Sequence, residues 1–191
     1  MPLTKLNATK GLTGTLPAVS GANLTGISAG ILNADIYRYT ASTGGADGDI
    51  TANLERVDDA STGFIGTGMS VSSGVFSFPS TGIYLLLMQC HINFVNEADN
   101  GALVTAKVTL NNSSYDDVCR VFAGSNSTSN NSRFTVYAHA IIDVTDTSNV
   151  KVKFTGSSFD SQTYLEGNTD QNDTSFTFIR LGDTWWQIKN I

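Results

Sequence analysis

The sequence has few of the residues on which enzymes and nucleic-acid-binding proteins depend. Its 191 residues include only 11 Lys and Arg, 2 His and 2 Cys, and the formal net charge is −6. Nucleic acids and anionic membranes attract clustered cations, so we expect neither as a partner. His91 and His139 offer little for acid–base or metal chemistry, and Cys90 and Cys119 make neither a zinc site nor a disulfide framework. We therefore expect no enzymatic activity and no cofactor.

Long hydrophobic runs are also absent, so we expect no transmembrane helix. Residues 1–7 lack the charged and apolar regions of a secretory signal, and we expect none. Charged residues make up only 15% of the chain, whereas 18 Gly, 20 Ser, 23 Thr and 16 Asn make up about 40%. This composition favours turns and strands over helices. The hydrophobic content of 40% is enough for a folded core.

Alternation of apolar and polar residues predicts strands from residue 35 onward. The longer predicted strands are 83–94, 102–110, 134–144, 150–154 and 175–181, and the shorter ones are 36–41, 51–57, 69–71, 75–78 and 117–122. Turn clusters rich in Gly, Asn and Ser separate them. Eight or more strands without a convincing helix predict an all-β sandwich or jelly roll. Residues 83–88 are apolar on both faces of their strand. In a two-sheet sandwich one face of each strand meets water, so the apolar residues on that face need another protein surface to cover them. We therefore expect an oligomer.

Residues 74–85 (GVFSFPSTGIYL) and residues 175–182 (SFTFIRLG) carry a resemblance to a known family. They resemble two segments of the complement globular-head and tumour-necrosis-factor-like (TNF-like) jelly rolls. The first is similar to the family's short strand, Pro/Gly turn and long buried strand, and the second is similar to its last strand. The resemblance covers residues 35–183. It implies a TNF-like jelly-roll β-sandwich that forms a homotrimer, with one sheet packed around the threefold axis. The residues expected at this trimer interface are Tyr84, Leu85, Leu86, Leu87, Phe176 and Phe178.

Residues 1–34 differ from the rest because they hold two of the three prolines and no aromatic residue. Two interpretations are open, a disordered linker or an extended arm that becomes ordered against partner chains. Regularly spaced apolar residues favour the arm, and the expected anchors are Leu3, Leu6, Leu12, Leu16, Val19, Leu24 and Ile27. We divide the chain into an attachment arm (1–34), a jelly-roll domain (35–183) and a tail (184–191).

The arm has a resemblance of its own. Residues 11–27 (GLTGTLPAVSGANLTGI) look like segments in fibres and other virion proteins of tailed phages, where such a segment commonly precedes a trimeric head. This implies a structural protein on the outer surface of a phage particle, a capsid decoration, cement or short head-fibre trimer whose main partner is the major capsid protein. The alternative is the receptor-binding tip of a tail fibre, in which Tyr115, Tyr164 and residues 126–131 recognise a host glycan or surface protein.

Four further features have weaker signals. Residues 26–30 (GISAG) fit a nucleophile elbow, but no flanking strand and helix accompany them, and we expect no catalysis there. Acidic turns at 44–49, 58–59, 116–117 and 170–173 offer oxygen ligands for calcium, although solvated turns are the preferred interpretation. Cys90 and Cys119 form a disulfide only if their strands are neighbours. The tail's Trp185 and Trp186 either cap their own domain or contact a neighbouring subunit, the particle or a ligand.

Overall fold

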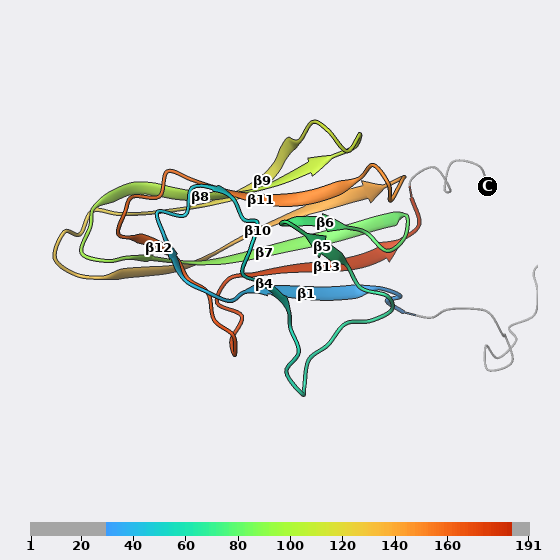
Figure 1. Cartoon of the computed structure of the whole chain (residues 1–191), viewed down its shortest axis with the longest axis horizontal. Coiled ribbons are helices and arrows are strands. Elements are labelled where there is room, and N and C mark those ends of the chain that lie inside the picture. The colour runs from blue at the N-terminus through green and yellow to red at the C-terminus, as the bar shows by residue number, and fades with distance from the viewer. Residues whose placement is uncertain (1–29, 185–191) are drawn as a thin grey trace, which may run out of the picture. The chain divides into compact units, whose positions relative to one another are not determined.

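Antiparallel strands make up most of residues 30–184, the part of the chain that the computed structural model describes (Figure 1). Sheet I contains β1 (Ala34–Tyr39), β2 (Thr43–Gly44), β4 (Leu54–Arg56), β7 (Gly82–Phe94), β10 (Ser132–Val144), β12 (Thr163–Leu165) and β13 (Ser175–Gly182). Sheet II contains β3 (Gly48–Asp49), β5 (Ser70–Ser72), β6 (Val75–Ser77), β8 (Asp99–Thr109), β9 (Asp116–Ser125) and β11 (Lys151–Ser157). None of the described residues forms a helix long and apolar enough to cross a membrane. The expected all-β sandwich is confirmed.

The long strand β7 organises sheet I. Strand β10 pairs with it along its whole length, from Phe94 opposite Ser132 to Gly82 opposite Val144. The other edge of β7 is shared between β13 and the short strand β12. Directly paired residues of antiparallel strands point to the same face, so these registers determine which side chains lie together on each face of the sheet.

The core lies between the two sheets and is rich in aromatic residues. The rings of Phe154 on β11 and Phe176 on β13 stack across the sandwich with their centroids 3.6 Å apart. Phe76 on β6 contacts both rings edge-on. All three side chains are completely buried. These contacts join strands from both sheets, which alternation in the sequence predicts for a sandwich core.

Two turns explain the sequence of residues 74–85. Ser73 and Gly74 both have positive φ, 48° and 77°, as a two-residue hairpin between β5 and β6 requires. After β6 the chain turns through Ser80 into β7. The hydroxyl of Tyr84 donates to the carbonyl of Ser80 at 3.1 Å, and its ring packs against Phe78. The tyrosine therefore fastens the turn to the strand that follows it.

The sandwich has two distinct ends. At one end, which we call the base, β1 begins beside the end of β13, and the loops 78–81, 110–115 and 145–150 turn. At the opposite end, which we call the loop end, lie the loops 45–47, 95–98, 126–131 and 158–162. The base is on the right in Figure 1 and the loop end on the left. Strand β1 starts at the base and strand β13 ends there.

Candidate subunit interface

The outward face of sheet I carries aligned rows of side chains from four neighbouring strands. One row consists of Ile36, Thr177, Leu87 and His139, and the next row toward the base consists of Ala34, Ile179, Leu85 and Ile141. Both rows run from β1 through β13 and β7 to β10. They place apolar side chains where a two-layer sandwich would ordinarily present polar ones to water.

Three apolar side chains on this face are strongly exposed. Leu87 is 40% exposed, Ile141 62% and Tyr137 68%. Tyr137 stands on β10 opposite Gln89 of β7, one row from Leu87 toward the loop end. Contiguous exposed apolar residues on a folded domain mark an interaction surface. We call this set, with Leu85 and Ile179 beside it, the sheet I patch.

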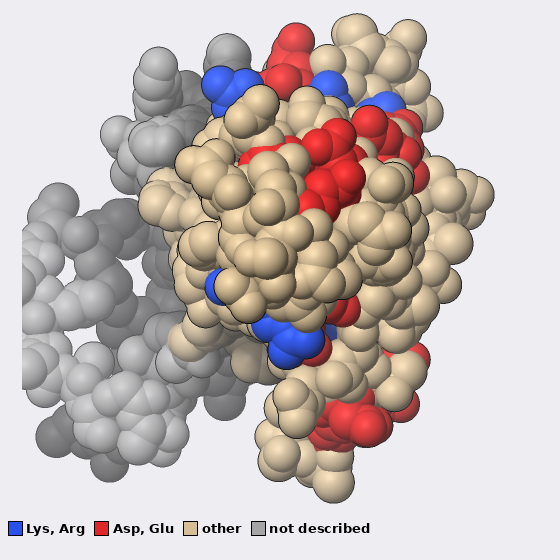
Figure 2. Space-filling model, turned by 90° about the vertical axis from the view of Figure 1, so that its left-hand side faces the viewer, with Lys and Arg blue, Asp and Glu red and all other residues tan. Residues whose placement is uncertain are grey.

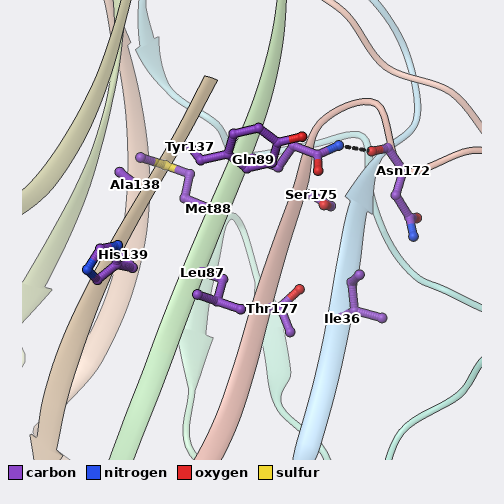
Figure 3. Close-up of a pocket in the computed structure, with 10 residues that line it drawn as sticks. All are labelled: Ile36, Leu87, Met88, Gln89, Tyr137, Ala138, His139, Asn172, Ser175 and Thr177. Atoms are coloured by element: carbon purple, nitrogen blue, oxygen red, sulfur yellow. Dashed lines mark hydrogen bonds between the residues drawn. The ribbon is translucent and has the colours of Figure 1, made fainter. Parts of the chain in front are cut away.

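A shallow hollow of about 290 Å³ lies within this face. Figure 3 shows it, with Leu87 and Thr177 between the strands, Tyr137 beside Gln89, and His139 at one side. The side-chain amide of Gln89 donates to the carbonyl of Asn172, which holds the loop before β13 against the rim. The hollow combines an apolar floor with polar groups at its margin, so it suits a protein side chain from another surface.

Unpaired hydrogen-bond acceptors accompany the patch. Three buried side-chain oxygens among the described residues have no partner, the Oδ1 atoms of Asn93, Asp143 and Asn172. Asn93 and Asp143 belong to the outward-facing rows of β7 and β10, and Asn172 lines the hollow. A buried acceptor without a donor is costly. Of the three, Asn172 borders the hollow, where a side chain seated in it can supply an N–H group.

The structure corrects the predicted trimer-interface residues. Four of the six, Tyr84, Leu86, Phe176 and Phe178, are at most 1% exposed, because they point between the sheets into the core of their own protomer. Side chains of a strand alternate between its faces, so only Leu85 and Leu87 reach the outward face. These two remain the predicted contacts.

The sequence reasoning missed Tyr137 and Ile141. Both lie in the otherwise polar row of β10, which also contains Arg133, Thr135, His139 and Asp143. The signal was present, because two large apolar residues interrupt that polar row. It was weak, because the opposite row of β10 is apolar from Phe134 to Val144.

The backbone is similar to solved structures of TNF-type proteins. Murine APRIL at pH 5.0 matches with a TM-score of 0.55 at 12% identity, over 78% of this chain and 98% of that chain. Eiger TNF from S. frugiperda matches with a TM-score of 0.56 at 11% identity, over 79% of this chain and 93% of that chain. The fold is a TNF-like jelly roll. No protein-family model and no curated protein matches the sequence, so the likeness is one of fold.

The two tyrosines predicted to contact a receptor lie far apart on the TNF-like jelly roll. Tyr115 precedes β9 at the base, where the ammonium of Lys153 sits 4.5 Å from its ring centroid. Tyr164 belongs to β12 near the loop end and pairs with Asn93 and Gly44. The structure therefore does not bring them into one site.

In two of the four acidic turns considered for calcium, the carboxylates bind cations of the domain itself. Asp49 accepts a hydrogen bond from the ammonium of Lys153 at 2.8 Å, which lowers the pKa of this carboxyl group. Asp58 and Asp59 both bind the buried guanidinium of Arg38. Within residues 30–184, no group of three or more His, Cys, Asp or Glu side chains is arranged to hold a metal ion.

The two cysteines are free thiols in the structure. Cys90 is completely buried in the core, and Cys119 on β9 is half-buried against that core. Burial raises the pKa of both thiols, and their mutual repulsion as thiolates raises that of Cys90 further. Both thiols are therefore mainly protonated at neutral pH, and the protonated thiol is the less nucleophilic form.

Several predicted sites lie outside the described residues. They are the arm anchors Leu3, Leu6, Leu12, Leu16, Val19, Leu24 and Ile27, most of the 26–30 motif, and the tail residues Trp185 and Trp186. These assignments stay predictions.

The loop end of the TNF-like jelly roll is acidic, and Figure 2 looks directly onto it. The carboxylate of Asp99, which is 3% exposed, accepts hydrogen bonds from the backbone of Gly101 and Asp160 and from the hydroxyl of Thr163. This ties the 158–162 loop to the start of β8. The pKa of the Asp160 carboxyl group is raised, most strongly by the negative charge of Asp99. Burial and the negative charges of Glu97 and Asp47 raise it further.

Replacing Asp160 with asparagine is expected to stabilise the domain at pH 7. A raised carboxyl pKa in the folded state means that the ionised form disfavours folding, and this penalty is present above the folded pKa and absent below the unfolded one. The gain in melting temperature should therefore disappear near pH 3. Thermal unfolding at both pH values checks it, with Asp170→Asn as a charge-matched control in another loop. An equal gain in that control would contradict the assignment.

Proposed function

We propose that this chain is a non-enzymatic structural protein of a phage particle, a homotrimeric capsid decoration, cement or short head-fibre protein attached through its N-terminal arm. The observation that carries the trimer is the sheet I patch in a TNF-like fold. A jelly roll that leaves Leu87, Tyr137 and Ile141 exposed has an apolar face for which a second copy is a ready cover.

The two ends of the domain support attachment at the base. Strand β1 begins there, so the chain that precedes β1 enters the domain from that end. The resemblance of residues 11–27 to phage virion segments supports a particle as the partner, with the major capsid protein as the surface to which the arm binds. A protein that binds the assembled shell and not free subunits stabilises that shell by linkage.

The test is a deletion of residues 1–27. Full-length protein should elute as a trimer, three times the protomer mass of 20.3 kDa, and should decorate particles. The deleted protein should remain trimeric, because the sheet I patch is intact, but should be missing from purified particles. If the deleted protein occupies particles as fully as the full-length protein does, attachment through the arm is refuted. If the full-length protein is monomeric, the trimer is refuted.

The receptor-binding alternative is favoured by one feature of the loop end. The loop 126–131 is entirely polar and largely exposed, and it lies opposite the base, where a particle-bound trimer presents it outward. Host adsorption separates the two functions. Particles lacking a decoration protein adsorb normally, whereas particles lacking a receptor-binding tip do not.

A further inference from the structure

A second apolar hollow lies at the base, at the open edge between the two sheets. It is lined by Val108, Leu110, Asp116, Val118, Ile141 and Ile142, and its volume is about 200 Å³. Leu110 is 67% exposed, Ile141 62% and Val118 42%. The hollow is smaller than the pockets of roughly 300–1,000 Å³ that hold small-molecule ligands. Its size and lining suit one large apolar side chain.

The described chain leaves the domain beside this hollow. Gly182 on β13 pairs with Ile83 on β7, and Ile83 pairs with Asp143 on β10. The exit is anchored there, because Arg180 forms an ion pair with Asp183 at 2.6 Å and donates to the carbonyl of Thr81. Neighbouring strands are about 4.8 Å apart, so the chain exits roughly 10 Å from β10.

The chain after Gly182 is long enough to reach the hollow, and its tryptophan side chains are suited to fill it. An extended chain spans about 3.3 Å per residue, so Trp185, three residues beyond Gly182, reaches about 10 Å and Trp186 about 13 Å. Indole rings are large and apolar, and each carries one N–H that needs an acceptor when buried. Asp143 offers one, because its Oδ1 atom is buried without a partner, two residues along β10 from Ile141.

We propose that the Trp185-Trp186 segment of each protomer docks on its own domain at the base, with an indole ring in the hollow formed by Leu110, Val118 and Ile141 and an indole N–H donating to Asp143. The docked segment covers the apolar edge that the two sheets leave open, and at Ile141 it borders the sheet I patch. This inference does not depend on the proposed role on a particle.

Intrinsic fluorescence tests the proposal directly, because both tryptophans of the chain are in this segment. In the full-length protein, emission should be blue-shifted and protected from acrylamide. Leu110→Asp and Val118→Asp should move the emission to that of solvent-exposed tryptophan while circular dichroism stays native. Phe122→Asp is the matched control, since Phe122 is an exposed residue of the same strand, β9, that does not line the hollow. Emission in the full-length protein like that of free tryptophan overturns the proposal, and so does emission unchanged by Leu110→Asp.

Three further variants test the role of Asp143 as acceptor and docking on the same protomer. Asp143→Ala removes the acceptor and should shift the emission partly to the red, whereas Asp143→Asn keeps an acceptor oxygen and should shift it less. If neither Asp143 variant shifts the emission to the red, Asp143 is not the acceptor of the indole N–H. In the Leu87→Glu variant, designed to be monomeric, the blue-shifted emission should persist. Its loss on dissociation would overturn docking on the same protomer, and mass measurement of the same samples reports separately on the trimer.

Discussion

Leu87→Glu is expected to convert the trimer into a monomer with a native fold. The substitution places a carboxylate in the middle of the sheet I patch, between Thr177 and His139. In a trimer each copy would bury this charge without a partner, at an effective cost of several kcal/mol per ion. Because each 1.4 kcal/mol changes an equilibrium constant tenfold, the dissociation constant should rise by at least about a hundredfold. Light scattering after size exclusion measures the mass directly.

A matched control distinguishes the effect of the outward face of sheet I from the effect of introducing a glutamate. Leu103 is a half-buried leucine on β8, on the outward face of sheet II. Leu103→Glu should leave the trimer intact, since that face lies on the opposite side of the sandwich. Dissociation by both variants, or by neither, would show that the sheet I patch is not the interface.

Phe154→Ala should produce the largest loss of stability of any substitution considered for this chain. The side chain is completely buried and stacks on Phe176 across the two sheets. Removing a buried phenylalanine ring costs about 3–5 kcal/mol, the sum of lost burial and the cavity left behind. Denaturant unfolding in the monomeric Leu87→Glu background measures this without the concentration dependence that an oligomer adds.

The control for this prediction is Phe122→Ala. Phe122 is 59% exposed on β9, so its removal should change the free energy of unfolding by no more than about 0.5 kcal/mol. Similar losses in the two variants would mean that Phe154 does not join the sheets as the structure places it. A small loss for Phe154→Ala alone would mean that the core relaxes into the space.

The fold was predictable because its long strands alternate cleanly. Strands β7, β8, β10, β11 and β13 all lie where alternation predicts them, with ends shifted by a few residues. The short strands β2, β3 and β12 were not predicted, because their residues show no alternation of apolar and polar side chains. Strand β9 runs on to Ser125 because Ala123 and Ser125 pair with β8, a contact between distant segments that the local sequence does not reveal.

The interface was only half predictable. Residues 83–88 are apolar in both rows, so the sequence revealed that β7 needs a second cover but not which row provides the contact. Cys90, Ile92 and Phe94 continue the inward row in phase with Tyr84 and Leu86, and this continuation identifies the core face. Residue pairs such as Leu87 and His139 depend on strand register, which arises from the packing of the whole sheet.

The arrangement of the two ends has a consequence for the order of the chain. Ala34 and Ile179 are register partners, so the first and last long strands of sheet I run side by side and their outer ends meet at the base. A short linker from the end of β13 to the start of β1 would close the domain into a ring. Reopened within residues 126–131, a circularly permuted protein would keep every sheet contact and carry a fused cargo at the loop end, away from the base.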